Sequence, residues 1–273
     1  MRHLALIALV LVACGATPVQ AQTLSLAYRS GDSYKYTFHS TSQRTIIAGG
    51  VTIPTNIEIT ASEVARVNSV DSSGVADLTL TLTNFMYKTT TGGISNTTSG
   101  LPDITTEITV AADGRVLSLD GKQVPAGNPF LASSGVGASY FVTAVLPSSA
   151  VKPGDTWSKD YTQNPGGAGA IKVTTRSKYL RDESVNGIRA AVVETMSDAS
   201  IDISTGGSGG LSMKGTMASD VTTWIDLINH RVIRSHSTES DDGTIDFGSS
   251  ANMGAMTGPM TNKGTGTTDL TPA

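Results

Sequence analysis

The chain has 273 residues and a formal net charge of −4, and it combines 31 serines, 37 threonines and 29 glycines with only 15% charged residues. No cluster of lysine and arginine is present to neutralise phosphates, which excludes a typical nucleic-acid-binding protein. A single cysteine excludes a fold held by disulfides, and abundant glycine and threonine exclude a coiled coil. The composition indicates a weakly acidic β protein.

The first 21 residues have the pattern of an export signal. Arg2 precedes an unbroken apolar run over 4–13, and residues 19–21 are Val-Gln-Ala. This pattern predicts a signal peptide over 1–21 that is cleaved before Gln22, so the mature protein is expected in the periplasm or outside the cell. The apolar run is shorter than the roughly 20 residues of a transmembrane helix, and we expect no transmembrane segment in the mature chain.

A second interpretation of this segment stays open. Residues 11–14, Leu-Val-Ala-Cys, match the bacterial lipobox, in which the cysteine is lipidated and becomes the first residue. Cys14 would then anchor the protein to the envelope. The following residues, GATPVQAQ, favour ordinary cleavage, which removes Cys14 and leaves a mature chain without a thiol. Such a chain suits an oxidising compartment and excludes thiol catalysis.

An internal repeat organises the rest of the chain. Three matches occur in the same order: 31–34 (Gly-Asp-Ser-Tyr) with 154–157 (Gly-Asp-Thr-Trp), 57–81 with 171–195, and 106–119 with 222–235. Their offset stays near about 115 residues, which predicts a duplicated structural unit. We therefore expect one duplicated β domain over 22–248, with repeat one at 24–120 and repeat two at 151–248.

Both repeats contain runs in which apolar and polar residues alternate. In one of them, Leu78, Leu80 and Leu82 alternate with threonines. A period of two predicts strands with one apolar face and one face toward water. Turn-forming residues separate the runs, and Asp113-Gly114 and Asn229-His230 predict matching tight hairpins.

One segment between the repeats breaks the β pattern. Asn128 followed by Pro129 is typical of the start of a helix, and Pro147 would end it. The apolar residues between them fall loosely on one face at helical spacing. The predicted fold class is therefore mainly antiparallel β, an internally duplicated curved sheet or half-barrel, with one central α-helix in the region 128–147.

The segment 249–273 is rich in glycine, methionine and threonine and has little periodicity. We expect an irregular tail whose last residues are disordered. Met253, Met256 and Met260 have thioethers at a spacing that Cu(I) sites use. Methionine also fills gaps in apolar cores, and we prefer that interpretation.

No pattern of catalytic or metal-binding residues stands out. The histidines lack neighbours at metal-ligand spacing, and Ser149 and Lys152 form Ser-x-x-Lys without the partner motifs of an acylating enzyme. Asp241 and Asp242 lie in a polar stretch that predicts a solvated turn. We expect no catalytic residues, no metal and no cofactor, so the protein is not expected to be an enzyme.

The string LPSSAVKPGDTW at 146–157 carries a resemblance to a known group of proteins. It resembles a family of uncharacterised bacterial envelope proteins that contain a duplicated β-unit and a V-x-P-G-D-x-W motif. The expected architecture is similar to the half-barrel of LolA/LolB-type lipoprotein carriers. The resemblance implies a curved antiparallel sheet around a helix, with an apolar concave face. Likeness of fold does not transfer function.

These observations favour an exported, non-enzymatic envelope protein that binds an apolar or amphipathic ligand, a lipid or lipoprotein-like molecule, on the concave face. The expected ligand-lining residues are aromatic: Phe130, Tyr140, Phe141, Trp157 and Trp224. The alternative is a structural or protein-interaction module of the cell surface with a filled core. The expected partner is an apolar small molecule or lipid rather than a nucleic acid.

Overall fold

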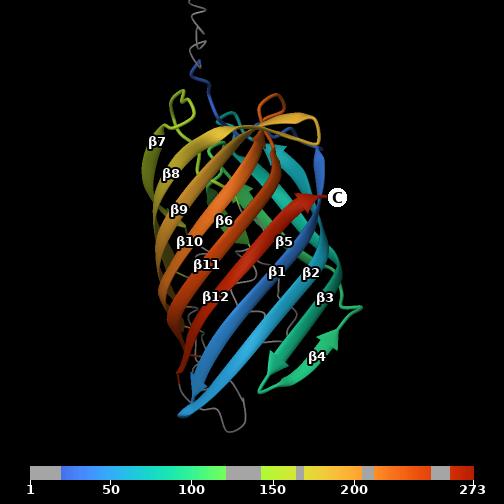
Figure 1. Ribbon diagram of the computed structural model, residues 1–273, viewed down its shortest axis with the longest axis vertical. Coiled ribbons are helices and arrows are strands. Elements are labelled where there is room, and N and C mark those ends of the chain that lie inside the picture. The colour runs from blue at the N-terminus through green and yellow to red at the C-terminus, as the bar shows by residue number, and fades with distance from the viewer. Residues whose placement is uncertain (1–19, 121–142, 164–168, 205–211, 247–258) are drawn as a thin grey trace, which may run out of the picture.

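The computed structural model describes residues 20–120, 143–163, 169–204, 212–246 and 259–273. Within these ranges every regular element is a β-strand, and there is no helix. The strands form one long sheet that curls into a nearly closed barrel (Figure 1). The predicted fold class of mainly antiparallel β is confirmed, and the curvature exceeds that of a half-barrel.

Twelve strands make up the sheet. In the first half they are β1 (Ser33–Ala48), β2 (Val51–Val70), β3 (Ala76–Thr91), β4 (Ile94–Thr98), β5 (Ile104–Val110) and β6 (Val116–Asp120). In the second half they are β7 (Thr156–Gln163), β8 (Gly169–Val185), β9 (Ile188–Ser204), β10 (Ser212–Asp226), β11 (Val232–Asp246) and β12 (Met260–Pro272).

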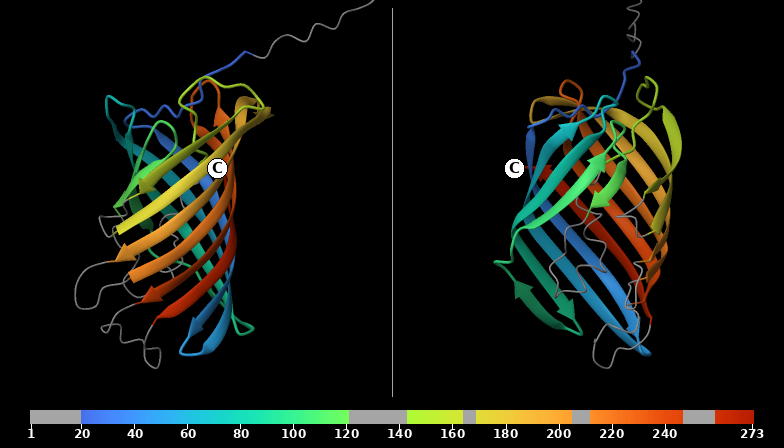
Figure 2. Two further views of the ribbon diagram at one scale, coloured as in Figure 1. Left: turned by 90° about the vertical axis from the view of Figure 1, so that its left-hand side faces the viewer. Right: turned by 180° about the vertical axis from the view of Figure 1, so that it is seen from behind.

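The strand order is β6-β5-β3-β2-β1-β12-β11-β10-β9-β8-β7, with β4 paired to β3 beside this path. Neighbouring strands in this order, and the pair of β3 and β4, are all antiparallel. Strands β6 and β7 are the two edges, and the views from the side and from behind show them approaching each other to form the seam of the barrel (Figure 2).

The alternating sequences fold as predicted. In β3, Leu78, Leu80 and Leu82 are at most 1% exposed, while the threonines between them lie on the other face. Burial of a leucine side chain stabilises the fold by roughly 1.5–3 kcal/mol. The alternation of leucine and threonine therefore determines which face of the strand points inward. The main apolar core is built from such inner-face residues of both halves.

Strand β12 corrects the expectation of an irregular tail after 248. It lies between β1 and β11 and pairs with both. Its alternation is hard to recognise because glycines, Gly264 and Gly266, occupy inner positions that an apolar residue usually marks. Met260, one of the three methionines considered for copper, is 8% exposed in a small apolar cluster, and Met253 and Met256 lie outside the described residues.

The predicted helix over 128–147 is not supported. Residues 128–142 lie outside the described residues, and residues 143–147 have no regular secondary structure. The backbone N–H of Ala144 donates to Thr223 Oγ1 at 2.8 Å, and that of Val145 donates to Thr195 Oγ1 at 3.1 Å. These hydroxyl groups, which line the inside of the sheet, satisfy the backbone without a helix. A segment inside a barrel is surrounded by apolar residues and is itself apolar. In the sequence, such an apolar run looks like the buried face of a helix.

Two segments without regular structure close one end of the barrel. Residues 20–32 and 143–151 both contribute buried leucines to the main core. Gln22 and Val151 join the two segments through an isolated antiparallel bridge. The N-terminal segment enters at the end of the barrel that is uppermost in Figure 1.

The turns that open the two repeats have the same local geometry. Gly31 and Gly154 both have positive φ, 91° and 98°. The N–H of Gly31 donates to the carbonyl of Val67 on β2 at 2.9 Å, and that of Gly154 donates to the carbonyl of Tyr179 on β8 at 2.7 Å. Matched hydrogen bonds at these positions support the interpretation of a repeat.

The predicted hairpins at 113–114 and 229–230 also correspond. Gly114 has a φ of 86° and His230 a φ of 52°, so a histidine adopts the left-handed conformation that glycine has in the first repeat. The structure places His230 in a turn between β10 and β11, where its backbone, rather than its ring, defines the local fold.

Candidate functional site

The inner face of the barrel is defined by the core residues Phe38, Ala61 and Leu270, which are directly paired across β2, β1 and β12. Residues paired across antiparallel strands lie on the same face. Arg44 lies six residues beyond Phe38 on β1, and even spacing along a strand places it on the inner face as well.

A pocket of about 930 Å³ extends across β7 to β12. The inner-face residues in its lining form one paired row across these strands: Tyr161, Val173, Ala199, Met217, Asp241 and Gly264. Most of this row is apolar, and it continues into a cluster with Ile171, Ile201 and Ile203. The volume lies in the range of pockets that hold small organic ligands.

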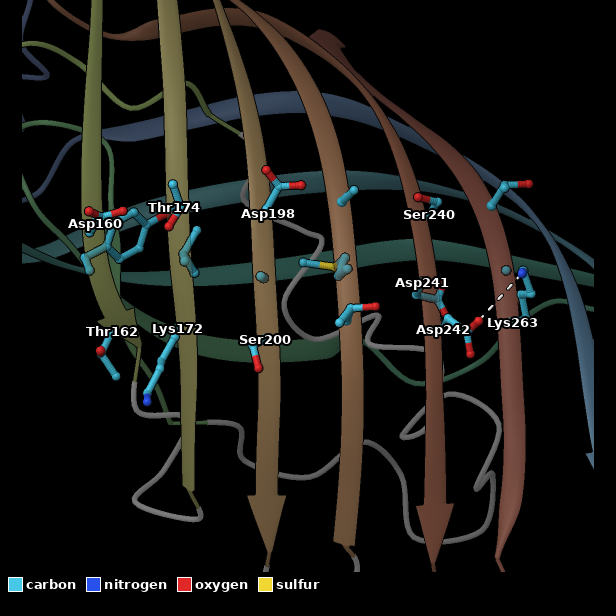
Figure 3. A pocket seen from close by; sticks show the side chains of 18 residues that line it. Asp160, Thr162, Lys172, Thr174, Asp198, Ser200, Ser240, Asp241, Asp242 and Lys263 are labelled. Atoms are coloured by element: carbon cyan, nitrogen blue, oxygen red, sulfur yellow. Dashed lines mark ion pairs between the residues drawn. The ribbon is translucent and has the colours of Figure 1, made fainter.

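The remaining residues of this lining alternate with the row and belong to the outer face. They carry most of the charges, as Figure 3 shows for Lys172, Asp198, Asp242 and Lys263. Asp242 and Lys263 form an ion pair of 3.6 Å between β11 and β12. The wall is therefore apolar on one face and charged on the other at the same level.

A second pocket, of about 670 Å³, adjoins the first and shares Thr265 with it. Its inner-face lining is again one paired row, from β11 through β12 and β1 to β2: Glu239, Gly266, Ser42 and Ile57. The two pockets thus meet where β11, β12 and β1 run side by side.

A charged cluster of Arg44, Glu239 and Asp241 lies at this junction on the inner face. Arg44 donates to Asp241 at 3.0 Å and approaches Glu239 at 3.8 Å. The Arg44 side chain is 8% exposed, whereas those of Glu239 and Asp241 are 20% and 19% exposed. Burial raises the pKa of both carboxyl groups, and the guanidinium opposes that rise.

Glycines make room for this cluster. A Cβ at Gly264 would lie 3.0 Å from Arg44 Cγ and from Asp241 Oδ1, and a Cβ at Gly266 would lie 3.0 Å from Glu239 Oε1. Contacts this short require a neighbour to move. The Gly-x-Gly pattern of β12 is therefore explained by the charged side chains that it faces.

Glu63 on β2 is an ionisable group of the inner face that lies apart from this cluster, deep in the main core. Its side chain is completely buried, and among the described residues neither carboxyl oxygen has a hydrogen-bond partner. Burial raises the pKa of this carboxyl group from 4.5 to about 8. Its directly paired neighbours are Tyr36 on β1 and Leu82 on β3.

Side chains rather than a backbone ladder join the two edges of the sheet. Lys159 on β7 forms an ion pair of 2.5 Å with Asp113, in the turn before β6. The guanidinium of Arg115 lies 5.5 Å from the ring centroid of Tyr161 on β7. These contacts cross the seam that closes the barrel.

The structure places the sequence-predicted ligand residues as follows. Phe130, Tyr140 and Phe141 lie outside the described residues, as does Cys14. Trp157 packs against the main core near the covered end, and its Nε1 donates to the carbonyl of Val145 at 2.8 Å.

Trp224 belongs to a separate cluster with Ala190, Val192 and Ile233, and it lies 4.7 Å from the guanidinium of Arg234. Neither tryptophan lines the two pockets.

Asp241 and Asp242 are not in a turn, as the sequence suggested, but in the middle of β11. They point to opposite faces, Asp241 to the cluster with Arg44 and Asp242 to Lys263. The sequence did not predict that Arg44, Glu239 and Asp241 form a cluster on the inner face. A signal existed for Arg44, because it falls in the same phase as the apolar residues of β1.

Among the residues that the structure describes, no group of three or more His, Cys, Asp or Glu is arranged to hold a metal ion. The same described residues include no helix that is long and apolar enough to span a membrane.

No protein-family model and no curated protein matches the sequence. The barrel is similar to lipovitellin, in a structure that addresses lipid–protein interactions, with 10% identity and a TM-score of 0.48. That match covers 90% of this chain but only 25% of the lipovitellin chain. An outer membrane channel from Pseudomonas putida F1 has 7% identity and a TM-score of 0.34, covering 90% of this chain and 97% of the channel.

At these identities and TM-scores, neither similarity carries information on function. The resemblance to the family with the V-x-P-G-D-x-W motif and to LolA/LolB-type carriers remains a prediction.

Proposed function

We propose that this protein is an exported, non-enzymatic envelope protein that binds an apolar or amphipathic ligand inside its barrel. The observation that carries the proposal is the inner wall beside the larger pocket, where Tyr161, Val173, Ala199 and Met217 form a continuous apolar row. Burying apolar ligand surface against such a row contributes roughly 25 cal/mol per Å².

The outer wall supports a barrel that encloses its ligand rather than one that faces lipid. At the level of the pockets it carries exposed ion pairs, Arg176 with Asp198 and Lys263 with Asp242. Barrels that face lipid carry an apolar band on the outside, and charges there are destabilising. An inside-apolar, outside-charged wall is the arrangement expected of a carrier in water.

Binding of a fluorescent apolar probe, N-phenyl-1-naphthylamine, to the delipidated protein tests the proposal. Ala199→Phe fills space on the inner wall, and we expect it to weaken probe binding by roughly tenfold or more, since it takes away apolar contact area. Ser200→Phe adds the same ring to the outer wall and is expected to leave binding unchanged.

Absence of probe binding by the wild-type protein refutes the proposal. So does an equal loss of affinity in both variants, because the inner wall would then have no special role. In either case the filled-core structural module becomes the better account. Thermal unfolding of both variants controls for loss of the fold.

A further inference from the structure

We infer that the ligand carries a cationic group, an amine or ammonium at the end of an apolar chain, and that Glu239 binds it. This inference rests on the proposed function and names the chemistry of the ligand. Its basis is the charge, the exposure and the position of the inner-face cluster at the junction of the two pockets.

Counted over the residues that the structure describes, the cluster carries an excess of negative charge. Arg44 provides one positive charge, and Glu239 and Asp241 provide two negative charges when ionised. The nearby Lys263 does not compensate for this excess, because it lies on the outer face and pairs with Asp242. Charge left uncompensated in a partly buried site is costly, and a cation removes that cost.

The excess charge is concentrated on Glu239. Asp241 accepts a 3.0 Å hydrogen bond from Arg44 and a second one from the Asn262 side chain. Glu239 is the more distant partner of Arg44, at 3.8 Å, which exceeds the length of a hydrogen bond. Its carboxylate therefore keeps more of its capacity to accept hydrogen bonds from a ligand.

Glu239 is also accessible from inside the barrel. It lines the smaller pocket, and its side chain is 20% exposed although it lies on the inner face. Glycine at position 266, directly opposite, leaves room for this carboxylate on the inner face, because a Cβ there would lie 3.0 Å from Glu239 Oε1. An ammonium group at this place can donate to Glu239 while its chain extends along the apolar row of the larger pocket.

The inner face also holds a cation, Lys159, in the same row as Glu239 but four strands away. Its charge is matched by Asp113 at 2.5 Å. Arg115, beside the same carboxylate, leaves that end of the row positive. An anionic ligand would bind at this positive end, near Lys159 and Arg115. The sign of the charge on the ligand that binds most tightly therefore tells which end of the row is the anchor.

The test compares three amphiphiles of equal chain length, dodecylamine, dodecanol and dodecanoate, as competitors of the apolar probe at neutral pH and below their micellar concentrations. We expect dodecylamine to bind roughly tenfold more tightly than dodecanol, because a charge-assisted hydrogen bond adds to the same apolar contact. Dodecanoate should bind most weakly.

Glu239→Gln keeps the shape of the side chain and removes its charge, and Arg44 keeps Asp241 as its partner. We expect this variant to bind dodecylamine no better than dodecanol, with dodecanol affinity unchanged. The control, Asp242→Asn, removes a charge from the neighbouring residue on the outer face and should preserve the preference for the amine. If Glu239→Gln does not fold, the order of affinity of the wild-type protein for the three amphiphiles still decides whether the ligand is cationic.

The outcomes separate the two proposals. If neither the probe nor any amphiphile binds, the proposed function fails and this inference fails with it. If the three amphiphiles bind equally, the carrier stands and the cationic ligand is refuted. Tightest binding of dodecanoate also refutes it and moves the anchor to the positive end of the row.

Discussion

Glu63 makes the stability of the barrel depend on pH in a direction that can be worked out from its surroundings. The carboxyl group is completely buried, its oxygens have no hydrogen-bond partner in the part of the chain that the structure describes, and burial raises its pKa from 4.5 to about 8. Each unit of pKa shift corresponds to 1.36 kcal/mol, so the full effect is roughly 5 kcal/mol. This is a large fraction of the stability of a typical domain.

The sign follows from proton binding. Below pH 4.5, Glu63 is protonated in both the folded and the unfolded state, and its contribution to stability is at its most favourable. Between 4.5 and 8, the unfolded chain releases the proton and the folded chain keeps it, so stability falls as the pH rises. Above about 8 both states are ionised, and the loss is complete.

Urea unfolding followed by tryptophan fluorescence, at pH 5 and at pH 8, measures this effect. Between pH 5 and pH 8 the free energy of unfolding of the wild-type protein should fall by most of the roughly 5 kcal/mol, and that of Glu63→Gln should not show this fall. The matched control is Glu58→Gln, because Glu58 lies on the same strand with a side chain that is 41% exposed. Its curve should follow that of the wild-type protein.

Comparison of variant and wild type at each pH cancels the other titrating groups. Identical pH dependence in Glu63→Gln and the wild-type protein would falsify the reasoning. It would mean that water or a rearranged side chain solvates the carboxylate in the folded state.

Three further perturbations have defined outcomes. Asp113→Asn removes the ion pair with Lys159 across the seam and should lower the free energy of unfolding by about 1 kcal/mol, measured by urea denaturation. Gly264→Ala forces a Cβ to within 3.0 Å of Arg44 and should cost about 1–3 kcal/mol in the same assay. Deletion of 260–272 removes the strand between β1 and β11 and should abolish cooperative thermal unfolding followed by circular dichroism.

The two substitutions each have a control on the outer face. Asp198→Asn breaks an ion pair whose two side chains are 60% and 59% exposed and should have little effect on stability. Thr265→Ala changes the residue next to Gly264 that faces outward, and it should be tolerated. An inner-face variant no more destabilised than its outer-face control contradicts the assignment of the two faces.

The strands could be predicted because apolar and polar residues alternate wherever one face of a sheet meets the core and the other meets water. Leu78 to Leu82 show it, and so do the paired turns at 113–114 and 229–230. What could not be predicted is how far the sheet closes. Closure depends on β12, which has glycines at two inner positions, 264 and 266, because Arg44 and Glu239 occupy the space opposite.

The predicted helix is not supported, and the predicted solvated turn at Asp241 and Asp242 is wrong, for related reasons. Ala144, Val145 and Leu146 are all buried because the chain runs through the interior, and sequence alone does not distinguish such a segment from a helical face. Glu239 and Asp241 suggested solvation because their neighbours are polar. Only the pairing of β11 with β12, and of β12 with β1, shows that both face Arg44.

The position of β12 also bears on how the barrel forms during synthesis. A ribosome makes β1 long before Met260–Pro272, yet this last strand is the one that connects β1 to β11. Until it emerges, the nascent chain holds two separate meanders, each with an unpaired edge open to wrong partners. Pairing β1 with β12 spans most of the chain, and such distant contacts form slowly. A chain with this order of strands stays incompletely folded until late, which is the state in which proteins are threaded across a membrane.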